Sequence, residues 1–445
     1  MTARMLARWQ RPATMVCAGL IARELAIFIG RTYRVSPLDN HFGFGWETGR
    51  IAASIASGHG FSSPFHLYPS SGPTALLAPI YPYLLAGIFK VFGIYSTASS
   101  ITILSLNSVF SSLTALPVFH IGKRVRGIRV AMWSGWLAAM LPYAWYWAIK
   151  WAWETSLATL LLACVFVLSL RMAGIAWTSD EEIEFAPNAS KRDWLLFGFL
   201  WGVIALTNPA LLLWLPFCGV WLVIRQSRRQ HSFRPVGLAV AAGTIFIALI
   251  APWTARNYFV FHKFIPLRGN FGTELRMGNA EDAVGLCRYW MQPNRNPEEF
   301  EKYRSMGEPA YSQEKLHEAM KFIRSYPGFF AVLSLKRAAY YWYDVPRESS
   351  DGRLLWYRNV GFLLSSILAI AGMMVMWRRR HPATFQFASL LFAIPLIYYV
   401  TYPHPRYRAP IEPEMLVLMV YLFLQTGPRH APAAKLPASA PVRYT

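Results

Sequence analysis

Long apolar runs recur along almost the whole chain of 445 residues, and they constrain the fold more than any other feature. A transmembrane helix needs roughly 17 to 25 mainly apolar residues. The runs lie near residues 13–30, 99–121, 130–148, 155–172, 194–207, 209–224, 235–253, 354–377, 384–401 and 412–427. With 54% hydrophobic residues, the chain is too apolar for an ordinary soluble domain. The sequence therefore predicts an all-α polytopic membrane protein with about ten transmembrane helices.

The apolar segment between Asp193 and Arg225 is too long for one span, and both of its ends are basic. Lysine and arginine are enriched in cytoplasmic loops, so both ends are expected on the cytoplasmic side. A turn at Thr207 to Pro209 would divide the segment into two short helices and satisfy this bias. We therefore predict a helical hairpin.

The stretch APIYPYLLAGIFKVFGIY, Ala78 to Tyr95, decides the topology. If it spanned the membrane, three basic loops, 123–129, 225–234 and 377–381, would lie outside, against the positive-inside rule. Its prolines, tyrosines and Lys90 are typical of an amphipathic helix at the membrane surface. We predict that it lies flat and that both chain termini are cytoplasmic.

This topology defines the domain organisation. An N-terminal transmembrane module, 1–253, contains the first outer loop, 31–98. A second outer segment, 254–353, has helical periodicity and proline punctuation, which predict a small helical layer on the membrane. C-terminal transmembrane helices, 354–427, and a flexible cytoplasmic tail, 428–445, complete the chain.

The formal net charge of +21 does not indicate a nucleic-acid partner. No RNA- or DNA-binding motif is visible, and the basic residues cluster between apolar runs, so topology explains the charge. Three of the four cysteines lie inside apolar runs, so no disulfide framework is expected.

Glu47 lies near the start of a short predicted helix, next to aromatic residues of the first outer loop. Partial desolvation would raise its pKa and make it a proton acceptor near neutral pH. A helix-start glutamate paired with Arg50 is an equally weighted alternative. Asp39 is a second candidate base, although its spacing alone favours the role of a turn residue.

Glu154 lies at the outer mouth of the fourth span, where a carboxylate is costly and usually has a partner. Two interpretations carry equal weight: an ion pair with Lys150, or a site shared with Glu47. Histidines such as His59 fall in no HExxH or Cys/His spacing, so no metal site is predicted from the motifs.

Arginines in outer loops run against the positive-inside rule and need a reason. Arg256, with Lys263 nearby, follows the seventh span, and Arg406 and Arg408 lie between the last two spans. Guanidinium groups match phosphate oxygens, so these residues are candidates for binding an anionic lipid headgroup. Snorkelling of each arginine to bulk lipid phosphate is the alternative.

Four features in this order resemble a known family: an acid before GHGF, then PIYPYLLAGIFKVFG, PWTARNY and PRYRAPIEP. Together they are similar to membrane glycosyltransferases of the GT-C fold. This class includes the dolichyl-phosphate-mannose protein mannosyltransferases and the bacterial lipid A aminoarabinose transferases, of the glycosyltransferase family 39 type. The likeness covers nearly the whole chain.

The resemblance implies an inverting hexosyl- or pentosyltransferase of the bacterial inner membrane, active on the periplasmic face among membrane lipids. Its donor would be a sugar on a polyprenyl phosphate, and its acceptor a lipid, a glycan or a protein. Glu47 or Asp39 would be the base, and Glu154 would orient the acceptor or help to hold a divalent metal. The substrate-binding residues expected are Arg50, His59, Tyr81, Arg256, Lys263, Arg406 and Arg408.

Two other functions fit an aromatic, cationic membrane cavity: a transporter or flippase for lipid-linked sugars, and a non-catalytic glycolipid binder. Transporters commonly contain internal repeats, and no duplicated halves are visible here. Neither function would require Glu47, whereas a transferase that uses it as the base would.

Overall fold

The computed structural model describes residues 9–34, 44–65, 70–177, 183–185, 189–344 and 352–426, and these are mostly helical, with very little strand. The helices are α2 (Pro12–Ile29), α3 (Glu47–Ala56), α4 (Ile80–Phe92), α5 (Thr97–Leu113), α6 (Ala115–Met140), α7 (Pro142–Lys150), α8 (Thr155–Met172), α9 (Lys191–Ala205), α10 (Leu215–Gln230), α11 (Arg234–Phe261), α12 (Phe271–Gly278), α13 (Pro297–Met306), α14 (Glu308–Ser325), α15 (Pro327–Tyr343), α16 (Gly352–Arg378), α17 (Thr384–Ala393), α18 (Leu396–Val400), α19 (Pro405–Arg408) and α20 (Glu412–Thr426). Short 3-10 turns cover Pro209–Trp214, Tyr289–Met291 and Ala409–Ile411. Strands β1 (Ile175–Trp177) and β2 (Ile183–Phe185) form one small antiparallel hairpin.

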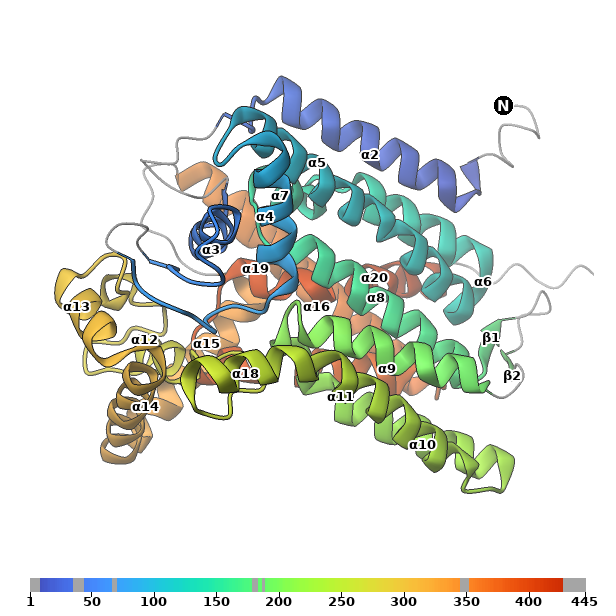
Figure 1. The fold of residues 1–445 in the computed structure, drawn as a ribbon. Helices are drawn as coiled ribbons and strands as arrows, with labels where there is room; N and C mark the ends of the chain where they lie inside the picture. Colours follow the sequence, from blue (N-terminus) through green and yellow to red (C-terminus); the bar gives the residue numbers. More distant parts are fainter. Residues whose placement is uncertain are drawn as a thin grey trace, which may run out of the picture.

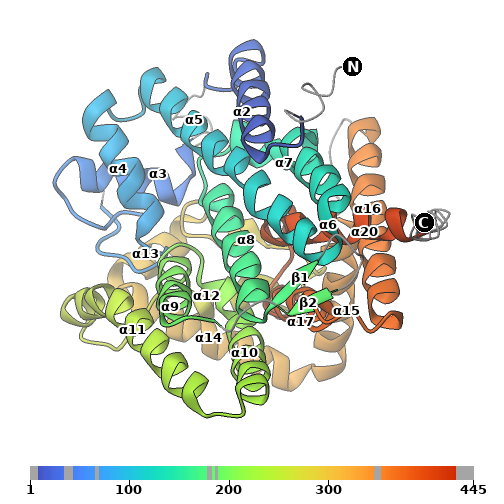
Figure 2. The ribbon, with the colours of Figure 1, turned by 90° about the vertical axis from the view of Figure 1, so that its right-hand side faces the viewer.

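The long helices run side by side along one main direction, which is the horizontal of Figure 1. Helices α3, α4, α12, α13 and α14 gather at one end, and β1 and β2 lie at the other. Figure 2 views the bundle from the β1–β2 end. The molecule is therefore a bundle with a helical layer on one end only, within the described residues.

Six helical stretches in the described residues are long and apolar enough to cross a membrane, and one of them, Thr97–Met140, contains two spans. Its helical path breaks at Arg126 and Gly127, where Gly127 has φ 75°. A Cβ added to Gly122 would lie 2.9 Å from the Cα of Ala131, so the two halves of α6 pack closely against each other after the break. The predicted spans 99–121 and 130–148 separate at this turn.

The predicted hairpin also has its turn where the sequence places it. Helix α9 ends before Asn208, whose side chain accepts a hydrogen bond from the Ala210 N–H. Beyond the turn, the ring of Trp214 lies 6.0 Å from that of Trp201, so the chain folds back on itself.

Helix α4 has 13 residues, which is short of the roughly 20 that a bilayer requires. In Figure 1 it runs across the direction of α2. Its buried face, including Leu85 and Phe89, packs on Phe44 and Ala52 beside and within α3. The stretch from Ala78 to Tyr95 is thus a helix that lies across the end of the bundle.

The three basic loops meet at the β1–β2 end of the bundle. Arg124 Nη1 donates a hydrogen bond to the carbonyl of Ile175 (2.8 Å), and a ring nitrogen of His381 lies 3.0 Å from the carbonyl oxygen of Val125. At the other end, the N–H of Gly269 donates to the carbonyl of Ala75 (2.9 Å), which joins the two outer segments. The basic loops therefore lie at one end of the bundle and the two outer segments at the other, which is the separation that the distribution of lysine and arginine predicts.

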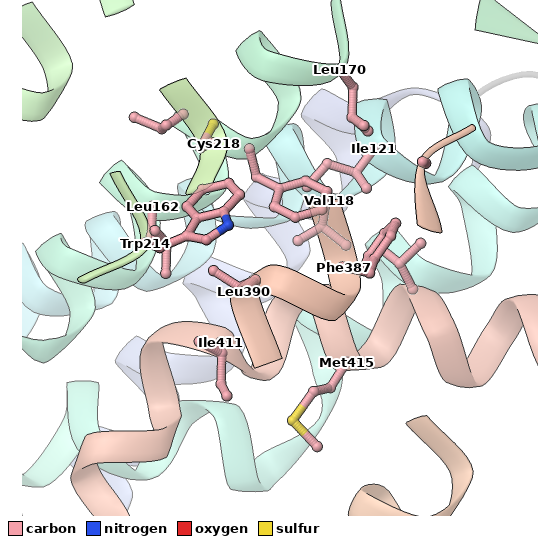
Figure 3. Close-up of a cluster of buried hydrophobic side chains, with 14 of the residues drawn as sticks. Val118, Ile121, Leu162, Leu170, Trp214, Cys218, Phe387, Leu390, Ile411 and Met415 are labelled. Atoms are coloured by element: carbon pink, nitrogen blue, oxygen red, sulfur yellow. The ribbon is translucent and has the colours of Figure 1, made fainter. Parts of the chain in front are cut away.

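The apolar core lies where α6, α8, α10, α17 and α20 meet (Figure 3). Val118, Leu162, Phe387 and Met415 contribute side chains to it from four different helices. Small residues allow some helices to approach closely: a Cβ at Gly198 would lie 2.1 Å from the carbonyl oxygen of Ala242. Close backbone approach at small residues is typical of membrane helices.

Candidate active site

A cavity of about 500 Å³ lies at the end of the bundle that carries the helical layer. Five parts of the chain supply its polar and aromatic lining: the start of α3, the α7–α8 junction, the turn after α9, the outer segment around α12, and the stretch from α18 to α19. The lining residues with side chains suited to binding or catalysis are Trp46, Glu47, Trp151, Trp153, Glu154, Asn208, Arg268, Asn270, Glu274, Tyr289, Arg295, Tyr398, Tyr402, His404, Arg406 and Tyr407.

The FGFGWETG stretch places Glu47 in this cavity. Gly45 has φ 79°, and a Cβ there would lie 2.1 Å from the carbonyl oxygen of Ala152. Trp46 has φ 48°, a value that bulky residues rarely adopt and that is often found at functional sites. The tight contact with Ala152 brings Glu47 to the chain segment that carries Glu154.

Burial is the main cause that raises the pKa of Glu47 above its ordinary value. The negative charge of Glu274 raises this pKa further, whereas the positive charges of Arg50 and Arg406 partly offset the shift. A carboxylate with a raised pKa, on the wall of a cavity, has the properties of a general base.

Arg406 is held by the aromatic wall of the cavity. Its guanidinium carbon lies 3.7 Å from the ring centre of Trp153, and its backbone N–H donates to Nδ1 of His404 (3.2 Å). The pKa of Arg406 is raised above its ordinary value. Burial acts to lower this pKa, but the negative charge of Glu154 is among the causes that raise it. The cavity therefore contains a positioned cation next to an acid.

Glu274 was not among the predicted site residues. Its carboxylate accepts hydrogen bonds from Asn270 Nδ2 (2.7 Å) and from the Tyr402 hydroxyl, and it lies 3.8 Å from Arg268 Nη2. Arg295 is a further lining cation, with its guanidinium carbon 5.0 Å from the ring centre of Trp46. In the sequence these charges resemble those of any exposed outer helix, and only the tertiary fold turns them towards the cavity.

Arg256 and Arg408 lie outside the cavity lining. Arg256 donates to the carbonyls of Thr74 (2.7 Å) and Phe61 (2.8 Å), so it fastens the first outer loop to α11. Arg408 is buried and forms an ion pair with Glu412 (2.6 Å). In this structure both guanidinium groups bind protein oxygens.

The other predicted residues are also outside the lining, and Asp39 lies outside the described residues. Tyr81 is buried and donates to Asn107 Oδ1 (3.0 Å), whereas His59 and Lys263 are exposed. Arg50 reaches the carbonyl of Pro64 (3.4 Å) and acts on Glu47 through its charge. Of the ten predicted site residues, the cavity lining brings together Glu47, Glu154 and Arg406.

The described residues do not form a donor set for a divalent metal. They contain no group of three or more histidine, cysteine, aspartate or glutamate side chains placed to hold one ion. No catalytic step is assigned to a metal.

No family model and no curated protein matches the sequence. Among solved structures, the chain is similar to the oligosaccharyltransferase AglB from Archaeoglobus fulgidus in complex with an inhibitory peptide and a dolichol-phosphate. The TM-score is 0.54 at 13% identity, covering 93% of this chain and 50% of that one. The apo form of that enzyme gives 0.52 at 13% identity, with the same coverage. ArnT from Cupriavidus metallidurans bound to undecaprenyl phosphate gives 0.38 at 14% identity, covering 89% and 77%.

The similarity to the two AglB structures confirms the predicted fold class. The chain has the GT-C fold, the architecture of a class of membrane glycosyltransferases. It spans about half the length of the archaeal oligosaccharyltransferase.

Proposed function

We propose that this protein is an integral membrane glycosyltransferase that moves a hexose or pentose from a polyprenyl-phosphate donor to an acceptor. The observation that carries the proposal is the convergence of Glu47, Glu154 and Arg406 on one cavity. The GT-C fold supports it, since the AglB structure with a similar fold contains a dolichol-phosphate and an inhibitory peptide. The acceptor is a lipid, a glycan or a protein.

Glu47 is the proposed general base. Its carboxylate takes the proton from an acceptor hydroxyl or amine, and the freed electron pair attacks the anomeric carbon of the donor sugar. The bond from that carbon to the phosphate oxygen breaks, and the polyprenyl phosphate leaves with the bonding electrons. Attack opposite the leaving group inverts the anomeric centre.

Arg406 is the proposed binding partner of the leaving phosphate, where negative charge grows in the transition state. Its planar donors match phosphate oxygens, and stacking on Trp153 fixes their direction. Arg268 and Arg295 add positive charge to the same cavity. Glu154, near Arg406, is suited to orient the acceptor.

We further propose that the cavity opens to the periplasm of a bacterial inner membrane, with both termini in the cytoplasm. The support is the collection of the basic loops 123–129, 225–234 and 377–381 at the end opposite the cavity, because cytoplasmic loops carry the excess of lysine and arginine.

The test is mass spectrometry of cell-envelope glycoconjugates from cells that make the wild type, Glu47→Gln or Glu301→Gln. Glu301 is an exposed carboxylate of α13 and serves as the control. A sugar mass that is present with the wild type and Glu301→Gln but absent with Glu47→Gln supports a transferase and names its product. Equal spectra from all three proteins, at equal expression, would favour a flippase or a non-catalytic binder.

A further inference from the structure

A second pocket lies at the far end of the bundle from the cavity. It has a volume of about 370 Å³ and lies on the C-terminal half of α10, with a lining of Trp221, Ile224, Arg225, Arg228 and Arg229. These residues recur at spacings of three and four, so they share one side of the helix. The lining includes three cations.

Contacts with the chain after α8 hold this basic pocket in shape. Arg225 Nε and Arg229 Nη1 both donate to the carbonyl of Ala173, at 2.9 and 3.1 Å. The guanidinium carbon of Arg225 also lies 5.4 Å from the ring centre of Trp221. Arg228 is exposed at the same pocket. Arg225 and Arg229 are already held in place, so binding an anion costs these two side chains little freedom.

An apolar groove of about 400 Å³ begins next to the basic pocket, between α9, α10 and α11. Ile224 lines both of them. The groove walls include Trp201, Val220 and Phe246, and glycine widens the groove, since a Cβ at Gly243 would meet no atom within 4 Å. Helices α10 and α11 belong to stretches that are long and apolar enough to cross a membrane, so the groove between them has walls of the kind that contact lipid chains.

A basic pocket at the mouth of a hydrocarbon-lined groove is filled best by one molecule that carries both an anionic group and an apolar chain. We propose that this site binds an anionic phospholipid of the surrounding bilayer, with its phosphate at Arg225, Arg228 and Arg229 and one acyl chain in the groove. Guanidinium donors suit the phosphate, and Trp221 is of the type that lies at headgroup level. Basic pockets between membrane helices recognise anionic lipids in this way. The site is separate from the cavity and does not depend on the proposed transferase activity.

Native mass spectrometry of the purified full-length protein in detergent, with added phosphatidylglycerol or phosphatidylcholine, tests the charge. The wild type should retain phosphatidylglycerol in preference to phosphatidylcholine. Arg228→Glu should weaken retention of phosphatidylglycerol about tenfold, because it removes one charge-assisted contact and adds repulsion. Arg234→Glu makes the same charge change at an exposed residue outside the pocket and should leave retention unchanged.

Gly243→Leu tests the groove, because Gly243 lines it and a Cβ at this position would meet no atom within 4 Å, which leaves room for the new side chain to enter the groove. It should lower retention of phosphatidylglycerol at least as much as Arg228→Glu does. Equal retention of the two lipids by the wild type, or equal effects of Arg228→Glu and Arg234→Glu, would overturn the proposal. Displacement of the bound species by inorganic phosphate alone, with no effect of Gly243→Leu, would identify a soluble-anion site and overturn it as well.

Discussion

At the scale of single residues, the position of Glu47 depends on its two preceding neighbours. Gly45 allows the chain to touch Ala152, and Trp46 adopts a strained backbone conformation directly before the acid. The sequence predicted an acid at a helix start, and α3 does begin at Glu47. It did not predict the contact with Ala152, because that contact joins residues more than a hundred positions apart.

Gly45→Ala tests this contact, and Gly58→Ala is its matched control. Both glycines have positive φ, 79° and 86°, so both substitutions should cost about 1–2 kcal/mol of backbone strain. Only Gly45 also meets a backbone oxygen, which should add about 1–3 kcal/mol. Thermal denaturation in detergent should therefore show a larger loss for Gly45→Ala, with loss of transfer activity. Equal losses for the two variants would remove the contact from the explanation.

The raised pKa of Glu47 predicts the pH dependence of transfer. The base must be deprotonated, so activity should fall as the pH drops through this pKa, which lies above the ordinary glutamate value. Glu274 contributes to the raised pKa, so Glu274→Gln should lower it and move the acid limb of the rate profile to lower pH. The readout is the midpoint of that limb rather than the maximal rate. A midpoint that stays fixed or moves to higher pH would contradict the assignment of the limb to Glu47.

At the scale of helices, one buried carboxylate joins the outer layer to the first outer loop. Glu308, the first residue of α14, accepts hydrogen bonds from the N–H of Ala75 (2.7 Å), the hydroxyl of Tyr303 (2.8 Å) and the hydroxyl of Thr74. These bonds converge on both oxygens of one side chain. The helical layer is therefore attached to the loop that contains Glu47.

Glu308→Gln should weaken this attachment. The amide oxygen can still accept from the Ala75 N–H, but the amide NH2 replaces the oxygen that accepts from the Thr74 and Tyr303 hydroxyls. These two bonds are lost or must reverse direction, at a cost of about 1–3 kcal/mol. Hydrogen–deuterium exchange should increase around Thr74 and in α14, while Glu301→Gln on exposed α13 should leave exchange there unchanged. Unchanged exchange in Glu308→Gln would show that other contacts hold the layer.

The helices were predictable from the sequence to different degrees. The length of the apolar runs located the spans, and the neighbouring Asn208 and Pro209 located the hairpin turn. Both signals depend only on residues that are close together in the sequence. The interruption at Leu141 and Pro142, and the break between α17 and α18, lie inside the predicted spans 130–148 and 384–401. Hydropathy averages over such breaks and so does not reveal them.

At the scale of the whole molecule, counting charges predicted which loops lie together at each end of the bundle. It did not predict which outer arginines line the cavity. Arg256 and Arg406 both occur in outer segments, yet one binds protein carbonyls and the other lines the cavity. Carbonyl and phosphate oxygens attract the same guanidinium donors, so residue type alone does not separate the two roles. The fold is needed to make that distinction.

Cysteine labelling tests the proposed sidedness in a background with the four native cysteines replaced by alanine. Lys302→Cys in exposed α13 should react with a membrane-impermeant thiol reagent in spheroplasts, because the cavity end faces outward. Lys123→Cys, at the basic end, should react only after permeabilisation. The reverse pattern would show that the orientation is inverted.

The most direct measurement of the central claim is release of polyprenyl phosphate by the purified protein in nanodiscs, with the donor and acceptor that envelope mass spectrometry identifies. Removal of a general base typically costs about 10²–10⁴ in rate, so Glu47→Gln should fall by that factor while Glu301→Gln keeps the wild-type rate. Arg406→Ala should raise the KM for the donor more than that for the acceptor. Wild-type release of the phosphate by Glu47→Gln would contradict the assignment of this cavity as the transferase site.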